Sequence, residues 1–187
     1  MPGHEIVGRV TAVGDLVTKF KVGDLAGVGC MVDSCQHCAP CDQGEEQYCE
    51  NGFTGTYNGP MFGGENTFGG YSTHIVVRES FVLHISHDES QLAAVAPLLC
   101  AGITTYSPIA QWNVGPGQKV AVLGLGGLGH MGVQIAAAKG ADVTVLSRSL
   151  RKAKFAEKLG ATRTLATSDD NFFRDHRGEF DFILNTT

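Results

Sequence analysis

The stretch Gln118–Ser149, "QKVAVLGLGGLGHMGVQIAAAKGADVTVLSRS", predicts a strand, a glycine-rich turn, a helix and a second strand in succession. The apolar run "KVAVLGL" is typical of a buried parallel strand, and apolar residues then recur at helical spacing up to Gly140. A G-x-G-x-x-G pattern alone is weak, but within a strand–turn–helix–strand unit of about thirty residues it is typical of a dinucleotide-binding turn. The candidate cofactor-binding residues of the turn are Gly124, Gly126, Gly127, Leu128 and Gly129.

Three glycines of this turn have separate expected roles. Gly124 permits the tight turn, Gly126 lets the backbone approach a pyrophosphate at the helix N-terminus, and Gly129 allows close packing of helix on strand. The alternative is a glycine-rich turn that binds no ligand. The strand on either side of the helix favours the dinucleotide site over this alternative.

The end of the second predicted strand indicates which dinucleotide is bound. A site for NAD usually has an Asp or Glu there, which binds the ribose 2′-hydroxyl. This sequence has hydroxyl and basic side chains at that point, which suit a 2′-phosphate and favour NADP. The alternative is that the basic residues are an ordinary solvated helix start. The candidate residues here are Ser147, Arg148, Ser149 and Lys152, with Arg151 beside them.

Four of the six cysteines lie in "CQHCAPCDQGEEQYC", with the spacing C-x2-C-x2-C-x7-C. Closely spaced thiolates are the ligands of tetrahedral structural zinc, and a site filled by four of them has no open position for chemistry. Gly44 is expected to supply the bend that returns the last cysteine. An iron–sulfur cluster is the main alternative, whereas disulfide bonds would need a secreted chain. The expected structural zinc ligands are Cys35, Cys38, Cys41 and Cys49.

Four more residues of metal-binding type lie outside that group. His4 and Glu5 precede an apolar, β-branched run, and a His–Glu pair by itself is more typical of a structural histidine than of a metal ligand. Cys100 by itself would be a buried thiol. Cys30, in the apolar stretch "LAGVGC", is expected to be a small buried hydrophobe.

Composition argues against several classes of partner. The chain of 187 residues has a net charge of −5 and no block of Lys or Arg, so no nucleic-acid-binding surface is expected. The longest apolar run, "LAAVAPLLCAGI", is shorter than the ~20 residues of a membrane span, and Pro97 interrupts it. The N-terminus lacks the pattern of a signal peptide, so a cytoplasmic protein without membrane or nucleic-acid partners is expected.

These elements, in this order, resemble the zinc-dependent medium-chain alcohol dehydrogenases. The resemblance is strongest to the cinnamyl-alcohol-dehydrogenase-type branch, which includes bacterial NADP-dependent aldehyde reductases. It is carried by "GHEIVGRVTAVG", "GVGCMVDSCQHCAPCDQGEEQYC", "GGYSTHIVV", "APLLCAGITTYSP", "GLGGLGHMG" and "FDFILNT". The resemblance implies that His4 and Cys100 bind a catalytic zinc ion, with Glu5 at the metal, and that Thr104 lies close to the nicotinamide ring. It also assigns the structural zinc to the four clustered cysteines.

The implied fold class is α/β. A partial GroES-like, β-rich catalytic domain with a helical connector would occupy residues 1–114, and the first half of a Rossmann parallel sheet would occupy residues 115–187. By the resemblance, family members begin before the "GHE" motif, in a segment that holds the first catalytic cysteine and the proton relay, and they continue beyond Thr187. The chain is therefore expected to be the central part of an enzyme, with little or no activity in isolation.

The implied activity is interconversion of primary alcohols and aldehydes with NADP(H), at a catalytic zinc ion supported by a structural one. The implied partner is a small-molecule alcohol or aldehyde, with a homodimer in the full-length parent. Two alternatives belong to other classes: a non-catalytic zinc- and nucleotide-binding module, and a zinc-ribbon interaction domain. The "GHE" motif and the βαβ unit argue against the zinc ribbon, because a zinc ribbon needs neither.

Overall fold

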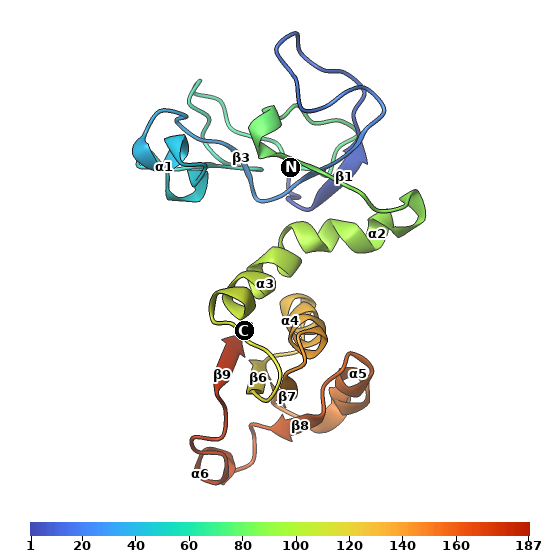
Figure 1. The fold of residues 1–187 in the computed structure, drawn as a ribbon, viewed down its shortest axis with the longest axis vertical. Helices are drawn as coiled ribbons and strands as arrows, with labels where there is room; N and C mark the ends of the chain where they lie inside the picture. The colour runs from blue at the N-terminus through green and yellow to red at the C-terminus, as the bar shows by residue number, and fades with distance from the viewer. The chain divides into compact units, whose positions relative to one another are not determined.

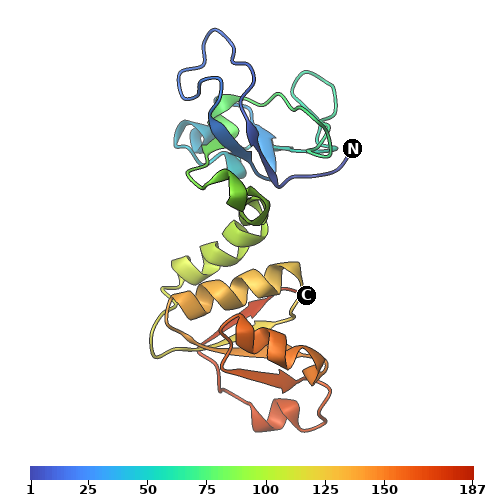
Figure 2. The same ribbon diagram turned by 90° about the vertical axis from the view of Figure 1, so that its right-hand side faces the viewer.

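The computed structural model describes residues 1–187, which form two compact units, Met1–Cys100 and Ala101–Thr187. Figures 1 and 2 show their elements. Helix α3 (Ala101–Gln111) packs against α4 (Gly127–Ala138), and this packing makes α3 part of the second unit.

The second unit contains a four-stranded parallel sheet, as predicted, in the order β8-β7-β6-β9. Val120 and Val122 are fully buried with the side chains of α4, while Ala121 between them packs with Phe172 on the other face. Burial on both faces of the sheet explains why the sequence of strand β6 is a continuous apolar run. The strands are β6 (Lys119–Leu123), β7 (Asp142–Ser147), β8 (Arg163–Ala166) and β9 (Phe182–Asn185).

The strand order reverses at β6. From β6 the chain adds β7 and then β8 on one side, and it returns to add β9 on the other side. In sheets of this kind, ligands bind in the crevice at the carboxyl ends of the strands where the order reverses. The glycine-rich turn follows β6 directly, so it lies at this point of the sheet.

The remaining helices of the second unit are short. After β7 follow a 3-10 turn, η5 (Leu150–Lys152), and helix α5 (Ala153–Lys158). A further short helix, α6 (Phe172–Asp175), lies in "DDNFFRDHRG".

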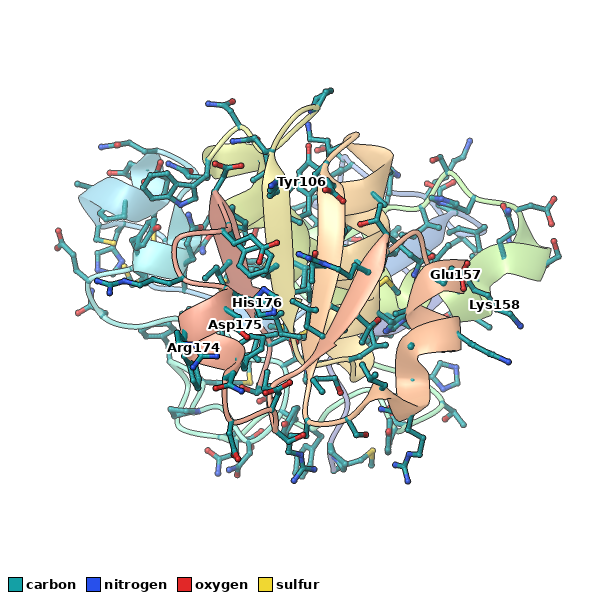
Figure 3. All side chains as sticks on the ribbon, turned by 90° about the horizontal axis from the view of Figure 1, so that it is seen from below. Tyr106, Glu157, Lys158, Arg174, Asp175 and His176 are labelled. Atoms are coloured by element: carbon teal, nitrogen blue, oxygen red, sulfur yellow. The ribbon has the colours of Figure 1, made fainter.

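A charged group lies at the β8 edge of the sheet. The guanidinium of Arg163 donates to one carboxylate oxygen of Glu179 at 2.5 Å, and Nδ1 of His176 lies 2.5 Å from the other oxygen. These contacts, with the Arg163 hydrogen bond first, hold the pKa of Glu179 below its usual range. Figure 3 shows His176 next to Arg174 and Asp175, so this group connects the end of α6 with the sheet edge.

The first unit is built on two small antiparallel sheets, with the strand orders β1-β2-β5 and β3-β4. The strands are β1 (Ile6–Arg9), β2 (Leu25–Val28), β3 (Met31–Asp33), β4 (Thr54–Gly55) and β5 (Val82–His84). The short helices are α1 (Ala39–Asp42), η1 (Glu46–Tyr48), η2 (Glu79–Phe81), η3 (Glu89–Gln91), α2 (Leu92–Val95) and η4 (Ala96–Leu99). Short strands and turns of this kind agree with the predicted β-rich domain.

Most of the stretch "GGYSTHIVVRESFVLHI" is irregular, although it is rich in the β-branched and aromatic residues of strands, and only its end forms β5. The physical reason is that its first residues pair with the N-terminus. The backbone of residues 69–71 donates three hydrogen bonds to residues 1–3, at 2.9, 2.9 and 3.0 Å. This pairing fixes the chain directly before His4.

The predicted helical connector is present, from Glu89 to Gln111, but it is interrupted. Cys100 has φ −133° and ψ −72°, which are not helical values, and it separates η4 from α3. No single helix in the structure is long and apolar enough to cross a membrane. Only the broken pair Glu89–Leu99 and Ala101–Gln111 meets the length and composition criterion, and a pair of this kind is weak evidence for a span.

Candidate functional site

The four clustered cysteines form a compact group in the first unit. Their sulfur atoms all lie within 4.8 Å of one another, and all four are free thiols. The sulfur of Cys41 lies 3.4 Å from that of Cys38 and 3.9 Å from that of Cys35, and the Cys38 and Cys49 sulfurs are 3.9 Å apart. Four sulfurs about 2.3 Å from one tetrahedral ion stand about 3.8 Å apart, so this group fits a zinc ion.

The local backbone explains why these cysteines converge. Helix α1 begins directly after Cys38, and Pro40 stands in its first turn, where a missing N–H group costs no hydrogen bond. This single helical turn separates Cys38 from Cys41 and brings both sulfurs to one side. Gly44 has φ +76° and turns the chain back, as predicted.

Backbone N–H groups surround the sulfurs of this cluster. The N–H of Cys35 points at the sulfur of Cys49, and the N–H of Glu50 points at the sulfur of Cys38, both at 3.5 Å. A hydrogen bond from the backbone N–H of His37 is the main cause that lowers the pKa of Cys35 to about 6. The donor to Cys35 favours its thiolate form, which is the form that binds zinc. The backbone donors Glu50 and Cys41 also act to lower the pKa of Cys38, but burial and the neighbouring thiols outweigh them and raise it.

A second group of metal-binding side chains lies in the same unit. One ligand atom from each of His4, Cys30 and Cys100 lies within 4.8 Å of the other two. His4 and Cys100 are thus neighbours in space. These are the two residues that the family resemblance assigns as ligands of one metal ion. The prediction that Cys30 is a small buried hydrophobe is wrong, because Cys30 is exposed and its thiol belongs to this group.

The carboxylate of Glu5 is not one of the three grouped ligand atoms. Its negative charge nevertheless acts on the group. Burial of the sulfur, a hydrogen bond with Cys100, and then the charges of Cys100 and Glu5 raise the pKa of the Cys30 thiol to about 11. Without a metal ion Cys30 is therefore protonated at neutral pH, and a cation that binds there must displace this proton.

Thr104 lies on α3 in the second unit and is exposed. The next residue, Thr105, is buried and donates its hydroxyl to the carbonyl oxygens of Ala101 at 2.7 Å and Gly102 at 3.2 Å. Of these two neighbouring hydroxyls, only that of Thr104 lies on the exposed side of the helix.

The glycine-rich turn has the geometry that its sequence predicts. Gly124 has φ +89°, which side chains disfavour, and a Cβ on Gly129 would lie only 2.2 Å from the carbonyl oxygen of Gly124. Gly126 directly precedes α4, and nothing lies within 4 Å of the position that its Cβ would take; the same holds for Gly127. The turn is therefore closed on the strand side and open at the helix N-terminus, where a phosphate would bind.

Basic and hydroxyl side chains lie beside this turn. Ser147 ends β7 and is half-buried, and Arg148 and Ser149 follow it at the surface. The ammonium group of Lys152 donates to the carbonyl oxygen of Leu125 at 2.9 Å. This hydrogen bond holds a positive charge against the backbone of the glycine-rich turn.

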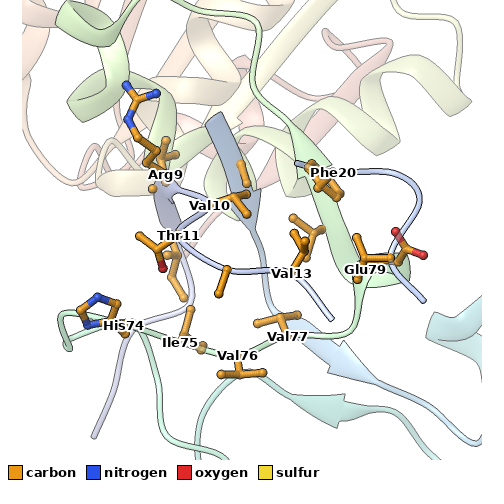
Figure 4. A pocket seen from close by; sticks show the side chains of 18 of the residues that line it. Arg9, Val10, Thr11, Val13, Phe20, His74, Ile75, Val76, Val77 and Glu79 are labelled. Carbon is orange, nitrogen blue, oxygen red and sulfur yellow. The ribbon is translucent and has the colours of Figure 1, made fainter. Parts of the chain in front are cut away.

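A cavity of about 460 Å³ lies in the first unit, apart from both metal-binding groups. Figure 4 shows it between the segment that follows β1 and the irregular segment before β5, with Val10, Val13, Phe20 and Val77 among its lining side chains. None of the residues of the two metal-binding groups lines it, so it is not part of the candidate metal site.

Two family models match this chain. Residues 1–87 match the alcohol dehydrogenase GroES-like domain, and residues 127–187 match the zinc-binding dehydrogenase model. The chain is 56% identical over 187 residues to aldehyde reductase YahK of Escherichia coli (strain K12). It is 59% identical over 187 residues to NADP-dependent alcohol dehydrogenase C 1 of Mycolicibacterium smegmatis. Each match covers all of this chain but only 53% of the relative. The chain therefore spans about half the length of the curated relatives it matches.

Two solved structures are also similar over the whole chain. The Helicobacter pylori CAD complexed with NADP(H) has a TM-score of 0.91 and 43% identity, with 52% of that chain covered. The cinnamyl alcohol dehydrogenase SbCAD4 from Sorghum bicolor has a TM-score of 0.93 and 46% identity, with 53% covered. Together with the two family models and the sulfur-rich groups, these similarities show that the chain belongs to the zinc-dependent medium-chain alcohol dehydrogenases.

Proposed function

We propose that this protein is a zinc-dependent oxidoreductase that interconverts primary alcohols and aldehydes with NADP(H). The observation that supports this most is the grouping of His4 and Cys100, far apart in the sequence, with ligand atoms within 4.8 Å. The relatives named aldehyde reductase and NADP-dependent alcohol dehydrogenase support the substrate class and the cofactor. The activity is a proposal because the chain spans about half of those relatives.

The donor atoms support zinc at both sites. Four thiolates suit a closed structural site, whereas imidazole together with thiolate is the kind of donor set that alcohol dehydrogenases use for a catalytic ion with an open position. When bound, zinc supplies Lewis-acid polarisation of the substrate oxygen, and NADP(H) gives or takes the hydride. His4 and Cys100 would hold the catalytic ion, with Glu5 at the metal.

The residues of the second unit would bind and orient the nucleotide. The open glycines at the start of α4 would hold the pyrophosphate against backbone N–H groups. Ser147, Arg148 and Ser149 would contact the 2′-phosphate, together with Lys152. Thr104, exposed on α3, would lie close to the nicotinamide ring.

The proposed function also implies a cellular location and a set of partners. Six free cysteines, all of them in the two metal-binding groups, support a reducing compartment and hence a cytoplasmic location. The proposed partner is a small-molecule alcohol or aldehyde, without nucleic acid or membrane. The proposed homodimer of the full-length protein follows from the family resemblance alone.

Zinc analysis and nucleotide titration of this chain test the binding parts of the proposal. We expect zinc in the four-cysteine group of this chain, and NADPH binding at least about tenfold tighter than NADH binding, or about 1.4 kcal/mol. Turnover is measured on the product of the complete open reading frame, where we expect NADPH-dependent aldehyde reduction that Cys100→Ala abolishes without loss of NADPH binding. Retained turnover in zinc-free Cys100→Ala protein contradicts the proposal. Zinc and NADPH binding with no turnover favours a non-catalytic module instead.

Arg148→Ala is expected to weaken NADPH binding about tenfold or more and to leave NADH binding unchanged. A hydrogen bond to a charged group contributes about 1.5–3 kcal/mol, and only NADPH carries the 2′-phosphate that Arg148 would contact. Calorimetric titration of both nucleotides measures the change. Arg174→Ala on α6 is the control, since Arg174 is an exposed arginine that pairs with Asp175. Equal losses of affinity for NADPH and NADH would show that Arg148 does not recognise the 2′-phosphate.

A further inference from the structure

A buried serine lies against the four-cysteine group, and neither the family resemblance nor the proposed function assigns it a role. Ser34 directly precedes Cys35 and is 2% exposed. Its hydroxyl oxygen lies 3.2 Å from the sulfur of Cys41, which is a hydrogen-bond distance for sulfur. A hydroxyl so close to a metal ligand acts on the strength with which that ligand binds.

Zinc binding decides which atom of this pair donates the hydrogen bond. Zinc is bound by the thiolate, which has no proton, so the Cys41 sulfur of a loaded site only accepts hydrogen bonds. The hydroxyl of Ser34 must then donate its one proton to this sulfur. The lone pairs of its oxygen stay available for another donor.

A second side chain holds the serine hydroxyl in that direction. The amide Nε2 of Gln36 donates to the hydroxyl oxygen of Ser34 at 2.5 Å. The oxygen therefore accepts one hydrogen bond while its own proton faces the sulfur of Cys41. Since Gln36 is exposed and Ser34 is buried, this chain of hydrogen bonds runs from the surface to the metal-binding group.

The backbone at Gln36 supports the same interpretation. Gln36 has φ +64°, in the left-handed region that most side chains adopt only at a cost in free energy. The other two non-glycine residues with positive φ, Asn58 and Asn113, are of a type that adopts this region more readily. The hydrogen bond from its amide to Ser34 accounts for a glutamine at this unfavourable position.

Contacts outside the cysteine group fix the backbone of Ser34. Its N–H donates to a carboxylate oxygen of Asp33 at 2.9 Å, and Nε of Arg78 donates to the same oxygen at 3.0 Å. Asp33 ends β3 and pairs with Thr54 of β4. These contacts involve no sulfur atom, so the hydroxyl is in place before an ion binds.

Cys41 differs from the other three cysteines of the group in the source of its hydrogen bond. Backbone N–H groups donate to the sulfurs of the other three, as described above. The Cys41 sulfur has the side chain of Ser34 beside it instead, and Cys41 is only half-buried. Ser34 thus supplies to the fourth sulfur what the backbone supplies to the others.

We propose that Ser34, oriented by Gln36, is a positioning residue of the structural zinc site, and that its hydroxyl stabilises the zinc-bound thiolate of Cys41. This inference rests on the structural zinc ion of the proposed function and adds a residue that is not itself a ligand. The hydroxyl shares its proton in a hydrogen bond and does not transfer it, so Cys41 remains the ligand.

Zinc binding by the whole chain tests this assignment. Because groups that hydrogen-bond to a metal ligand typically contribute 10–100-fold to metal affinity, Ser34→Ala is expected to weaken zinc binding by about that factor. Competition with a chelator of known affinity measures this change, and a chromophoric chelator should show faster release of zinc. Ser72→Ala is the matched control and should bind zinc unchanged, since the Ser72 hydroxyl donates to the carbonyl oxygen of His74.

Gln36→Gly separates the hydrogen bond from a purely structural role of residue 36. Glycine adopts positive φ readily, so a purely structural role predicts unchanged or tighter zinc binding in this variant. We expect zinc affinity to fall about 2–10-fold instead, as for the loss of one ordinary hydrogen bond. In a Ser34→Ala background the same substitution should have no further effect, because no hydroxyl remains to be oriented.

A third readout needs no variant. In the unchanged chain loaded with an NMR-active isotope of cadmium, the hydroxyl proton of Ser34 should exchange slowly with water and show scalar coupling to the metal. If Ser34→Ala binds and releases zinc like the unchanged chain, if Gln36→Gly binds zinc more tightly, or if this coupling is absent, the inference fails while the proposed function stands. If the four-cysteine group of the unchanged chain binds no zinc, both fail.

Discussion

Gly129→Ala is expected to lower the free energy of unfolding of the second unit by about 3 kcal/mol and to abolish NADPH binding. The added methyl group would lie 2.2 Å from the carbonyl oxygen of Gly124 and 3.0 Å from the hydroxyl oxygen of Thr186. Overpacking of this kind typically costs 1–3 kcal/mol, and here the closest obstacle is backbone, which cannot rotate away. Hydrogen exchange of β6 and β7, followed by mass spectrometry, measures the loss of stability within this unit.

Gly126→Ala is the matched control for Gly129→Ala, because it adds the same methyl group three residues earlier in an open position. We expect its stability to stay within about 0.5 kcal/mol of the unchanged chain, as for a surface substitution. NADPH affinity should nevertheless fall, since the methyl group occupies the proposed path of the pyrophosphate to the helix N-terminus. Unchanged NADPH affinity in Gly126→Ala would show that the nucleotide does not approach here. Equal stability losses in both variants would contradict the packing argument.

Cys49→Ser is expected to remove the structural zinc ion and to unfold much of the first unit, at a cost of about 4 kcal/mol or more. The clusters of buried apolar side chains around the sheet belong to the second unit, and the corresponding cluster of the first unit consists of the cysteines themselves. A unit with so little other core depends on its metal for stability. Zinc analysis and hydrogen exchange of peptides from residues 1–100 measure the two effects.

Gln43→Ala is the control for Cys49→Ser, since Gln43 lies exposed in the same loop and has no sulfur. It should retain the full zinc content and the protection of the first unit. The second unit should keep its protected sheet in both variants, because its core contains no metal ligand. If Cys49→Ser retains both its zinc and its protection, the metal does not hold this unit together.

The features that the sequence alone predicted correctly are local ones. The βαβ unit and its glycine turn lie within a single segment, and the pairing of β6 with β7 brings together strands that are neighbours in the chain. The cysteine spacing likewise encodes its own geometry, because one helical turn and one return bend suffice to converge the sulfurs.

What the sequence did not reveal depends on contacts between distant segments. The closeness of Cys30 to Cys100 depends on the packing of Gly29 against Leu99, a contact that no spacing rule encodes. The irregular segment before β5 has the composition of a strand, yet its first residues pair with the N-terminus instead. The division between the compact units follows from the packing of α3 on α4, which the local sequence pattern does not encode.

The two metal-binding groups differ in how deeply they are buried. Cys35, Cys38 and Cys49 are shielded from solvent, whereas Cys30 is open to it. A chelator removes an ion most readily where it can coordinate an open position, so the ion held by the exposed group should have the shorter residence time. Protein purified in EDTA would then retain one ion per chain and its full fold. Such a preparation would pass every test of structural integrity while lacking the ion that we propose for turnover.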